Sequence, residues 1–435
     1  MKKKKISLGM YGTAIVSKMS LVILTLLTTA MINRCLGVVL KGEYAYINNW
    51  VSILVTVFSL GVGHTYSTYH RRYGKEALGT FVTLALARSL AVAIIAAVAW
   101  IVRADYDVRW MLLITTFAVL KSNILYIAAI EDVRKRDINN IFYKVLYTLI
   151  IFVAFVNQIQ SLELMLGLLI VDEVITVGGT FLKYKLRPSF KFLHEQAEDK
   201  KGRLKILFGI YTLGFISMLM FLMINLNYNL DVIMLKQMTN DYNVGLYSVG
   251  VNLANLLFLV PDAFKDVLFH KTAKEDSIRD IVASIKVNIL IDLVLIGGFA
   301  VVGKWFIELM YGSEFIGSYP VTLVLFAGSL SMVIYKMVHP LYISKGRQKT
   351  VFFILLASVI LNAVANLILI PMMGIMGAAI ASVVSYTACS IIFLMVFCRE
   401  YGLKVHKVFL IQKDDIRTVK ELIMRKGLRA KTGSR

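Results

Sequence analysis

Long apolar blocks alternate with short polar segments along the whole chain. A helix needs about 20 apolar residues to cross the hydrocarbon core of a bilayer, and the blocks have that length. The pattern therefore predicts an all-α polytopic membrane protein with about twelve transmembrane helices. We place these spans roughly at 8–33, 42–66, 78–102, 110–131, 138–157, 161–183, 205–230, 244–268, 281–303, 318–343, 350–370 and 376–398.

The eighth block is apolar enough to span a bilayer, yet its polar residues recur at helical spacing. Ser248, Asn252, Asn255 and Asp262 follow one another at steps of four, three and seven, which places them on one helical face. Such a face should line another helix or a water-filled cavity rather than lipid. Pro261 can free backbone groups and bend this helix.

Similar polar faces occur in the first two spans. Asn49, Ser52 and Ser59 of the second span coincide with Asn252, Asn255 and Asp262 after a shift of 203 positions. Both halves of the chain therefore carry a polar-faced helix, which predicts a duplicated bundle around a central hydrophilic cavity. The first span carries a further stripe at steps of four and seven, formed by Ser7, Tyr11, Lys18, Thr25 and Thr29.

Composition supports the membrane assignment, because 58% of the residues are hydrophobic and only 17% are charged. The net charge of +21 does not indicate a nucleic-acid partner, since the basic residues concentrate in alternate loops, which is the signature of membrane orientation. This distribution predicts that both termini lie in the cytoplasm. The predicted domains are a six-helix bundle at 1–186, a cytoplasmic connector at 187–204, a second six-helix bundle at 205–398 and a basic tail at 399–435.

The basic tail has two interpretations. Ile416, Val419, Leu422 and Ile423 are spaced like one face of a helix among charged residues, which favours an amphipathic helix on the inner leaflet. A solvated cytoplasmic tail explains the same composition.

Motifs of catalysis and metal binding are absent from the sequence. It contains no phosphate-binding loop, no His-Glu-x-x-His motif and no nucleophile elbow. Cys35, Cys389 and Cys398 have no metal-ligand spacing and are expected to be free thiols. We therefore expect no metal site, no cofactor and no enzymatic activity.

Charged residues inside the predicted spans are the remaining candidates for function, because a lone charge at the bilayer centre costs about 2.5–3.5 kcal/mol on insertion scales. Asp172 and Glu173 are interpreted either as an ion-coupling site or as ion-pair partners of Arg88 or Lys121. Asp231 and Asp262 are further candidates for ion coupling. Three more charges are interpreted as side chains that snorkel toward the membrane surface, namely Lys144, Lys286 and Asp292.

Three stretches give the chain a resemblance to a known family. They are N-R-C-L-G-V-V-L-K-G-E-Y-A-Y at Asn33–Tyr46, L-D-V-I-M-L-K-Q-M-T-N-D-Y-N-V-G-L-Y-S-V at Leu230–Val249, and N-L-I-L-I-P-M-M-G-I-M-G-A-A-I-A-S at Asn366–Ser382. In this order, with twelve spans, the chain resembles the O-antigen type polysaccharide flippases of the multidrug/oligosaccharidyl-lipid/polysaccharide exporter superfamily.

The resemblance implies a MATE-like fold, in which two six-helix bundles face a cavity lined mainly by the first two helices of each bundle. It implies a bacterial cytoplasmic membrane protein that moves undecaprenyl-pyrophosphate-linked oligosaccharide to the outer leaflet. Its partners would be this lipid-linked oligosaccharide, membrane lipids, and polysaccharide polymerase and chain-length proteins.

In that family, cavity cations would hold the pyrophosphate, while hydroxyl and amide groups would meet the sugars. Lys18 is placed for the first role, and Arg34 lies inside the first family-like stretch, where it could equally anchor the interface. The full set of candidate cavity residues is Tyr11, Lys18, Thr25, Thr29, Arg34, Asn49, Ser52, Ser59, Arg88, Lys121, Ser248, Asn252 and Asn255.

Other functions stay open at the level of sequence. An ion-coupled multidrug antiporter of the same superfamily would favour a cavity rich in acids and aromatic residues, whereas the first stripe is cationic. A membrane glycan polymerase or ligase would need a sizeable outer loop, and the predicted outer loops are short. A passive membrane scaffold would not need polar stripes in both halves.

Overall fold

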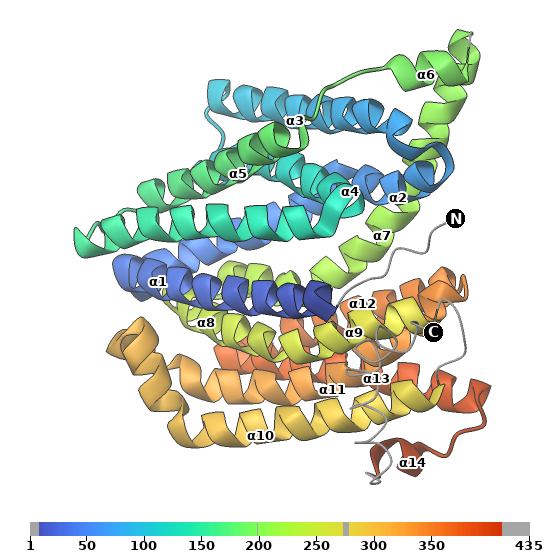
Figure 1. The fold of residues 1–435 in the computed structure, drawn as a ribbon. Helices are drawn as coiled ribbons and strands as arrows, with labels where there is room; N and C mark the ends of the chain where they lie inside the picture. Colours follow the sequence, from blue (N-terminus) through green and yellow to red (C-terminus); the bar gives the residue numbers. More distant parts are fainter. Residues whose placement is uncertain (1–7, 198, 273–277, 411–435) are drawn as a thin grey trace. The chain divides into compact units, whose positions relative to one another are not determined.

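The structure, a computed structural model, describes residues 8–197, 199–272 and 278–410, with residues 8–18, 266, 267 and 269–272 described by backbone alone. Every regular element in these ranges is a helix (Figure 1). Contacts between residues divide the chain into two compact units, Thr13–Asn229 and the part from Leu230 onward, with which the start of α1 up to Gly12 is grouped. Asn229 and Leu230 are neighbours within one helix. The predicted basic tail beyond residue 410, with its amphipathic pattern, lies outside the described residues.

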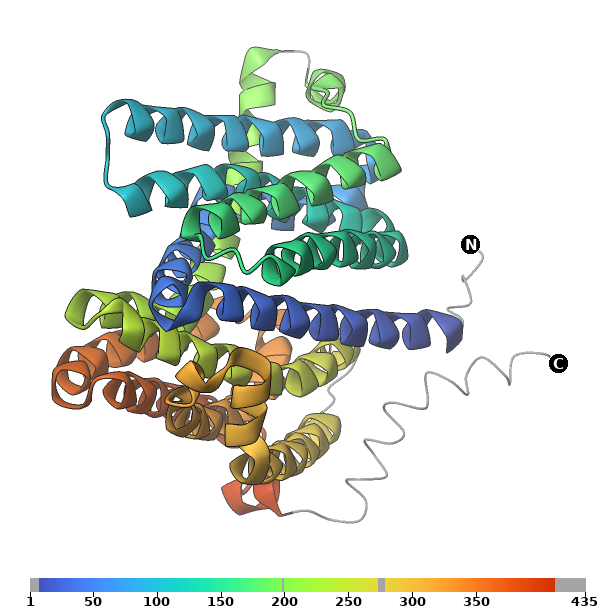
Figure 2. The same cartoon turned by 90° about the vertical axis from the view of Figure 1, so that its left-hand side faces the viewer.

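The first unit runs from Thr13 to Asn229. Within it α3 packs on α4 and α4 packs on α5, and the three run side by side in both Figure 1 and Figure 2. Its elements are α1 (Leu8–Ser59), α2 (Val62–Tyr73), η1 (Gly74–Ala77), α3 (Leu78–Ile101), α4 (Tyr106–Val156), α5 (Leu162–Tyr184), α6 (Lys191–Gln196) and the larger part of α7 (Lys200–Met238).

The second unit begins at Leu230, near the end of α7. Its centre is α11, which packs against α8, α9, α10 and α13, and α12 packs on α13. Its further elements are α8 (Asp241–Leu257), α9 (Leu259–Thr272), α10 (Ile278–Tyr311), η2 (Ser313–Phe315), α11 (Ser318–Ser344), α12 (Gln348–Met373), α13 (Ile375–Glu400) and α14 (Val405–Phe409).

The first two predicted spans are joined without a loop, which the sequence pattern did not indicate. α1 continues through both and bends at Gly37, whose backbone angles of φ 64° and ψ −179° are not helical. Glycine adopts a positive φ without the steric cost that a Cβ brings. The bend at Gly37 therefore replaces the loop expected between the first and second spans.

A second kink joins the fourth and fifth predicted spans within α4. Asp132 has extended backbone angles there, with φ −161° and ψ 95°. Its carboxylate accepts a hydrogen bond from the backbone N–H of Lys135 at 3.0 Å, as a helix N-cap does. Its backbone carbonyl accepts one from the Tyr184 hydroxyl at 2.7 Å. The Lys135 N–H and the Asp132 carbonyl, which the kink removes from the helical hydrogen-bond pattern, therefore both have partners.

The second predicted span ends earlier than expected, because the chain turns at Leu60 and Gly61. Gly61 has a φ of 61° and lies against the backbone of Gly214 in α7, so closely that a Cβ would collide with the Gly214 carbonyl oxygen. Both the positive φ and the close approach require glycine at this position.

The predicted span at 244–268 is found as one apolar segment long enough to cross a membrane, Asp241–Lys265. It consists of two helices, because α8 ends at Leu257 and α9 begins at Leu259. Pro261 has no N–H to donate, and its ring would clash with the carbonyl of Leu257, the last residue of α8. Ser248, Asn252 and Asn255 therefore lie on α8, while Asp262 lies on α9.

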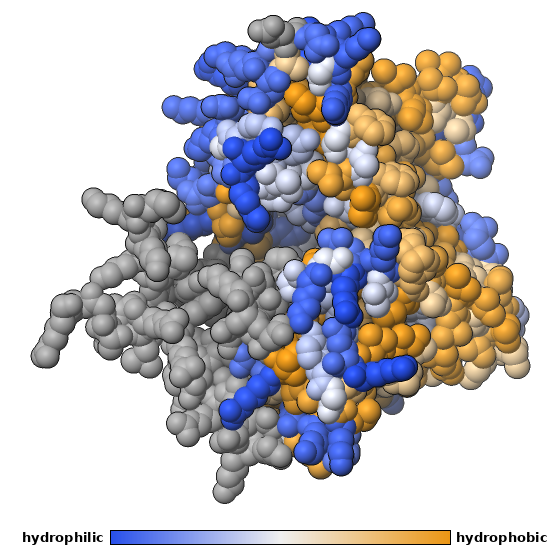
Figure 3. Space-filling model, turned by 90° about the vertical axis from the view of Figure 1, so that its right-hand side faces the viewer, coloured by the Kyte–Doolittle hydropathy of each residue, from blue (hydrophilic) through white to orange (hydrophobic). Residues whose placement is uncertain are grey.

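Ten helical segments of the described chain are long and apolar enough to cross a membrane, so the protein is a multi-pass membrane protein. Two of them, in α1 and α4, contain two helices joined at a kink. Ten segments thus accommodate the twelve predicted crossings. Many large apolar side chains face outward, such as Leu182 at 81% and Val301 at 85% exposure. Figure 3 shows hydrophobic and hydrophilic residues gathered in separate areas of one face.

Candidate functional site

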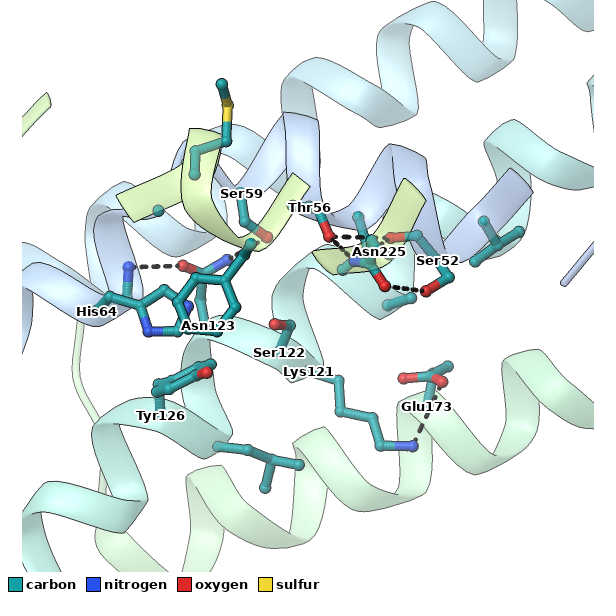
Figure 4. A pocket seen from close by; sticks show the side chains of 18 of the residues that line it. Ser52, Thr56, Ser59, His64, Lys121, Ser122, Asn123, Tyr126, Glu173 and Asn225 are labelled. Atoms are coloured by element: carbon teal, nitrogen blue, oxygen red, sulfur yellow. Dashed lines mark hydrogen bonds and ion pairs between the residues drawn. The ribbon is translucent and has the colours of Figure 1, made fainter. Parts of the chain in front are cut away.

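A pocket of about 470 Å³ lies within the first unit, and its lining combines apolar side chains with polar and aromatic ones. α1, α2, α4, α5 and α7 contribute its walls (Figure 4). Its polar and aromatic lining residues are Asn48, Ser52, Thr56, Ser59, His64, Lys121, Ser122, Asn123, Tyr126, Glu173, Phe221 and Asn225.

One wall joins α1 to α7 through hydroxyl and amide groups. The Ser52 hydroxyl donates to the Asn225 side-chain oxygen at 3.2 Å, and the Asn225 amide nitrogen donates to the Thr56 hydroxyl. Ser52 and Thr56 are one helical turn apart, so both face Asn225. Asn225 is only half-buried, which leaves part of this polar wall open to the pocket.

Asn123 of α4 holds a second wall together and is buried. Its side-chain oxygen accepts hydrogen bonds from the Gly63 N–H at 3.1 Å and the Arg88 guanidinium at 2.9 Å. Its amide nitrogen donates to the Ser59 hydroxyl at 3.3 Å and to the Val119 carbonyl at 2.7 Å. All four capacities of the amide are used, so Asn123 fixes α1, α2 and α3 against α4.

Aromatic rings close one end of the pocket. The His64 ring stacks on Phe221 with centroids 4.1 Å apart, and it meets Tyr126 edge-on at 3.8 Å. Figure 4 shows His64 and Tyr126 together at this end, away from the Lys121 and Glu173 pair. The rings offer a flat apolar surface beside the hydroxyl and amide groups.

An ion cluster lies at the other end. The Lys121 ammonium is 2.7 Å from the Asp172 carboxylate and 3.3 Å from that of Glu173. The three side chains are only 15–21% exposed, and the second oxygen of Glu173 has no hydrogen-bond partner among the described residues. One cation faces two acids, so the pocket offers no free positive charge from Lys121. The predicted alternative of an ion pair with Lys121 is thus present.

The structure brings only some of the predicted cavity residues of this unit together. Ser52, Ser59 and Lys121 line the pocket, as does Glu173 from the ion-coupling set. Arg88 lies behind the wall, bonded to Asn123. Away from the pocket lie Thr25 and Arg34, which are exposed, and Thr29 and Asn49, which are half-buried. The side chains of Tyr11 and Lys18 lie outside the described residues.

The residues of the polar stripe predicted for the second unit differ in how far they are buried. Ser248 is buried and donates to the Gly245 carbonyl of its own helix, while Asn252 is half-buried and Asn255 exposed. Asp262, on α9, is held by two cations. The ammonium groups of Lys265 and Lys336 each lie 2.8 Å from the same Asp262 oxygen.

Asp231 is buried at the end of α7 and fully paired. One carboxylate oxygen accepts hydrogen bonds from the Tyr247 hydroxyl and from the Ser382 hydroxyl, the latter at 2.8 Å. The other accepts from the Val232 N–H at 2.9 Å. The carboxylate joins α7 to α8 and α13 within the second unit.

The interpretation of Lys286 and Asp292 as snorkelling side chains is wrong, because they are only 4% and 1% exposed. Lys144 is half-buried, with its ammonium 4.9 Å from the centre of the Tyr147 ring. No group of three His, Cys, Asp or Glu residues that could hold a metal ion occurs in the ranges described.

Sequence reasoning missed several pocket residues. Thr56 continues the stripe of Ser52 and Ser59 at helical spacing, and this signal was available. Asn225 is one of three asparagines in a single membrane helix, which also marks it as unusual. His64 and Tyr126 gave no signal, because single aromatic residues are common in such helices.

The fold is similar to that of solved MurJ and MATE transporters, which confirms the predicted MATE-like helical fold. The structure is similar to "Lipid II flippase MurJ, inward closed conformation" with a TM-score of 0.68 and 13% identity, covering 94% of this chain and 91% of that one. It is also similar to an inward-facing "multidrug resistance MATE family transporter of the MOP superfamily", with a TM-score of 0.62 and 11% identity over 88% and 94% of the two chains.

At the level of sequence, the profile of the family "Lipid II flippase MurJ" matches residues 267–424, which is less than half of the chain. No curated protein sequence matches significantly. The O-antigen branch of the superfamily stays a prediction.

Proposed function

We propose that this protein is a flippase that carries an undecaprenyl-pyrophosphate-linked oligosaccharide from the inner to the outer leaflet by alternating access. The observation that carries the proposal is the pocket of the first unit. Hydroxyl and amide groups within membrane helices usually face the bundle interior or a cavity, and here they line a pocket together with aromatic rings. Their chemistry suits sugars, which present hydroxyl groups at their edges and apolar C–H groups on their faces.

The charges in the pocket favour the sugar part of such a cargo over its pyrophosphate. Lys121 is already paired with Asp172 and Glu173, so it offers no free cation to an entering anion. The pyrophosphate would need other cations. Lys18 and Arg34 are our candidates for that role, while Ser52 and Asn225 are our candidates for the sugars.

The comparisons support a lipid-linked cargo. A family profile of lipid II flippases matches part of the chain, and a solved lipid II flippase shares its fold. We propose an oligosaccharide repeat unit as the cargo, together with a location in the bacterial cytoplasmic membrane with both termini in the cytoplasm. Polysaccharide polymerase and chain-length proteins are the proposed partners.

An ion-coupled multidrug antiporter is the second candidate, and the MATE fold favours it. Such a transporter needs an acid that is free to exchange ions with its cargo. In the structure, lysines hold Asp172, Glu173 and Asp262, and two hydroxyl groups hold Asp231. This pairing leaves these four acids less suited to binding a cationic drug than to a structural role.

The test is mass spectrometry of membrane lipids from a strain depleted of this protein. We expect a pyrophosphate-linked oligosaccharide to accumulate on the inner leaflet, and wild-type protein to clear it. The double variant Ser52→Ala, Asn225→Leu should fail to clear it. Asn227→Leu is the matched control, since Asn227 is a buried amide of the same helix that does not line the pocket.

Two outcomes would decide against the flippase. If no lipid-linked glycan accumulates and dye efflux falls instead, the antiporter function replaces it. If glycan reaches the outside but stays unpolymerised, the protein acts as a glycan polymerase or ligase.

A further inference from the structure

A row of polar side chains runs along one face of α10, in the second unit. Ser284, Asn288 and Asp292 are spaced four residues apart, so they lie above one another on the helix. Each is at most 1% exposed. The opposite face carries Val294 and Val301, which are 68% and 85% exposed. The row therefore points into the unit, away from lipid.

Atoms of this row lack partners. The Ser284 hydroxyl, the Asn288 side-chain oxygen and both carboxylate oxygens of Asp292 have no hydrogen-bond partner in the described part of the chain. The Asn288 amide nitrogen is paired, with the Ser284 carbonyl at 2.8 Å and with the Met337 sulfur of α11 at 3.9 Å. Buried polar groups without partners are rare, so this row calls for a functional explanation.

A charged Asp292 would be very costly in this position. An ionised carboxylate that is enclosed and unpaired loses its hydration without any compensating contact. An uncharged carboxyl group that carries a proton avoids this cost. By the same argument Asp292 differs from Asp231 and Asp262, whose carboxylates are paired.

One cation lies on α11, the helix that packs against α10 on this side. Lys336 of α11 acts electrostatically on Asp292. Its ammonium lies 2.8 Å from Asp262, and it is buried, with its ammonium 4.3 Å from the centre of the Phe258 ring. Asp262 also has Lys265 at 2.8 Å, so it keeps a cation if Lys336 leaves. Lys336 can therefore move without leaving Asp262 unpaired.

We propose that Asp292 is a proton-binding site, and that loss of its proton draws Lys336 from Asp262 to Asp292. The proton of Asp292 is released to water, and Lys336 pairs the carboxylate that is left. Binding a proton reverses the exchange. Since Lys336 is on α11 and Asp292 on α10, the two protonation states favour two arrangements of these helices.

A metal cation is a weaker fit to this site. Asn288 is the one member of the row within a helical turn of Asp292, so few oxygens of the row converge there, whereas Mg²⁺ and Ca²⁺ take six or more oxygen ligands. Lys336 would also repel a bound cation. His339, which follows Lys336 by about one turn on α11, is a further titratable group near Lys336 and serves as a control.

The test is pH-dependent infrared difference spectroscopy of the full-length protein in lipid nanodiscs. The carbonyl stretch of a protonated carboxyl group should disappear from the wild type as the pH rises. This band should be absent in Asp292→Asn, shifted in Asp292→Glu, and unchanged in two controls. The controls are Asp280→Asn, which removes the other buried acid of α10, and His339→Gln.

The exchange of Lys336 has its own readout. In Lys336→Met the carboxylate loses its cation, so the band should persist to a pH about one unit higher, a tenfold lower proton concentration. An unchanged midpoint would refute the exchange. A band that survives in Asp292→Asn would refute the proton site itself.

The spectroscopic readout needs no substrate, so it stands even if the proposed flippase function fails. The role of Asp292 in transport does rest on that function. In the lipid assay, Asp292→Asn should abolish the pH dependence of clearance, whereas Asp280→Asn should retain it. A pH profile unchanged in Asp292→Asn would show that the proton does not drive transport.

Discussion

At the scale of single residues, the first unit separates groups that hold the protein together from groups that are open to a cargo. Asn123 uses its whole hydrogen-bonding capacity within the protein, and Lys121 is occupied by two acids. Asn225 is likewise bonded, to Ser52, Thr56 and Asn229, but Ser52 and Asn225 are only half-buried. A cargo can therefore compete for the second pair without dismantling the wall that Asn123 fixes.

Removing Lys121 should destabilise the protein through the acids that it leaves behind. In Lys121→Met, two adjacent and largely buried carboxylates lose their cation, which should lower the free energy of unfolding by about 3 kcal/mol. Chemical unfolding in detergent micelles measures this.

The matched control is the triple variant that also carries Asp172→Asn and Glu173→Gln. It has neither cation nor acids, so most of the lost stability should return. A triple variant as unstable as Lys121→Met would mean that Lys121 contributes through packing rather than charge.

At the scale of helices, the long helices bend or end at particular residues, and at some of these positions a residue far away in the sequence packs against the bend. Gly37 gives α1 its bend, and Asp132 gives α4 its kink with the help of Tyr184 of α5. Pro261 separates α8 from α9. At Gly61 the turn also allows a close approach to Gly214 of α7.

Gly61 and Gly74 form a natural pair for testing this close approach. Both have a φ of 61°, but a Cβ on Gly61 would meet the Gly214 backbone, whereas none of the described atoms lies within 4 Å of a Cβ on Gly74. Gly74→Ala should cost only the strain of a positive φ, about 1–2 kcal/mol. Gly61→Ala should cost clearly more.

Thermal unfolding of the two variants in detergent measures the difference. Equal losses would show that α7 moves away from residue 61 at little cost, and that the contact does not fix the end of α1.

The sequence pattern predicts the helices well, because lipid forces a spanning backbone to satisfy its hydrogen bonds within a helix. Of the residues that it proposed for a cavity, Ser52, Ser59 and Lys121 line the pocket. It could not identify the bond between Ser52 and Asn225, since 173 positions separate them. The sequence pattern could not locate the kink at Asp132 either. The Asp132 carbonyl is paired there by the hydroxyl of Tyr184, which is 52 positions away in the sequence.

The burial of Asp292 was equally beyond the sequence. The position of Asp292 in the sequence does not tell which side of α10 faces lipid. The lipid-facing side depends on where α11 packs against α10. Exposed valines such as Val294 and Val301 identify the lipid-facing side only once the helix has been placed.

At the scale of the whole molecule, the predicted orientation in the membrane is open to a direct test. The three native cysteines are buried, with Cys35, Cys389 and Cys398 at 3%, 1% and 5% exposure. They should react poorly with a hydrophilic maleimide, so a newly introduced thiol can be observed against a low background.

Arg71 and Arg103 are exposed and lie on opposite predicted sides of the membrane. In spheroplasts, a membrane-impermeant maleimide should label Arg103→Cys at once and Arg71→Cys only after permeabilisation. The unmodified protein is the control for background labelling. Reversed labelling of the two variants would invert the predicted topology and place both termini outside the cytoplasm.

The composition of the pocket has a consequence for the order of synthesis. Its lining residues all lie between Asn48 and Asn225. Chains are made from the N-terminus, so every one of these groups has been added when about half of the protein has left the ribosome. Ser52 and Thr56 wait for their partner Asn225 until α7 enters the membrane. Insertion of α7 is thus the biosynthetic step that completes this pocket.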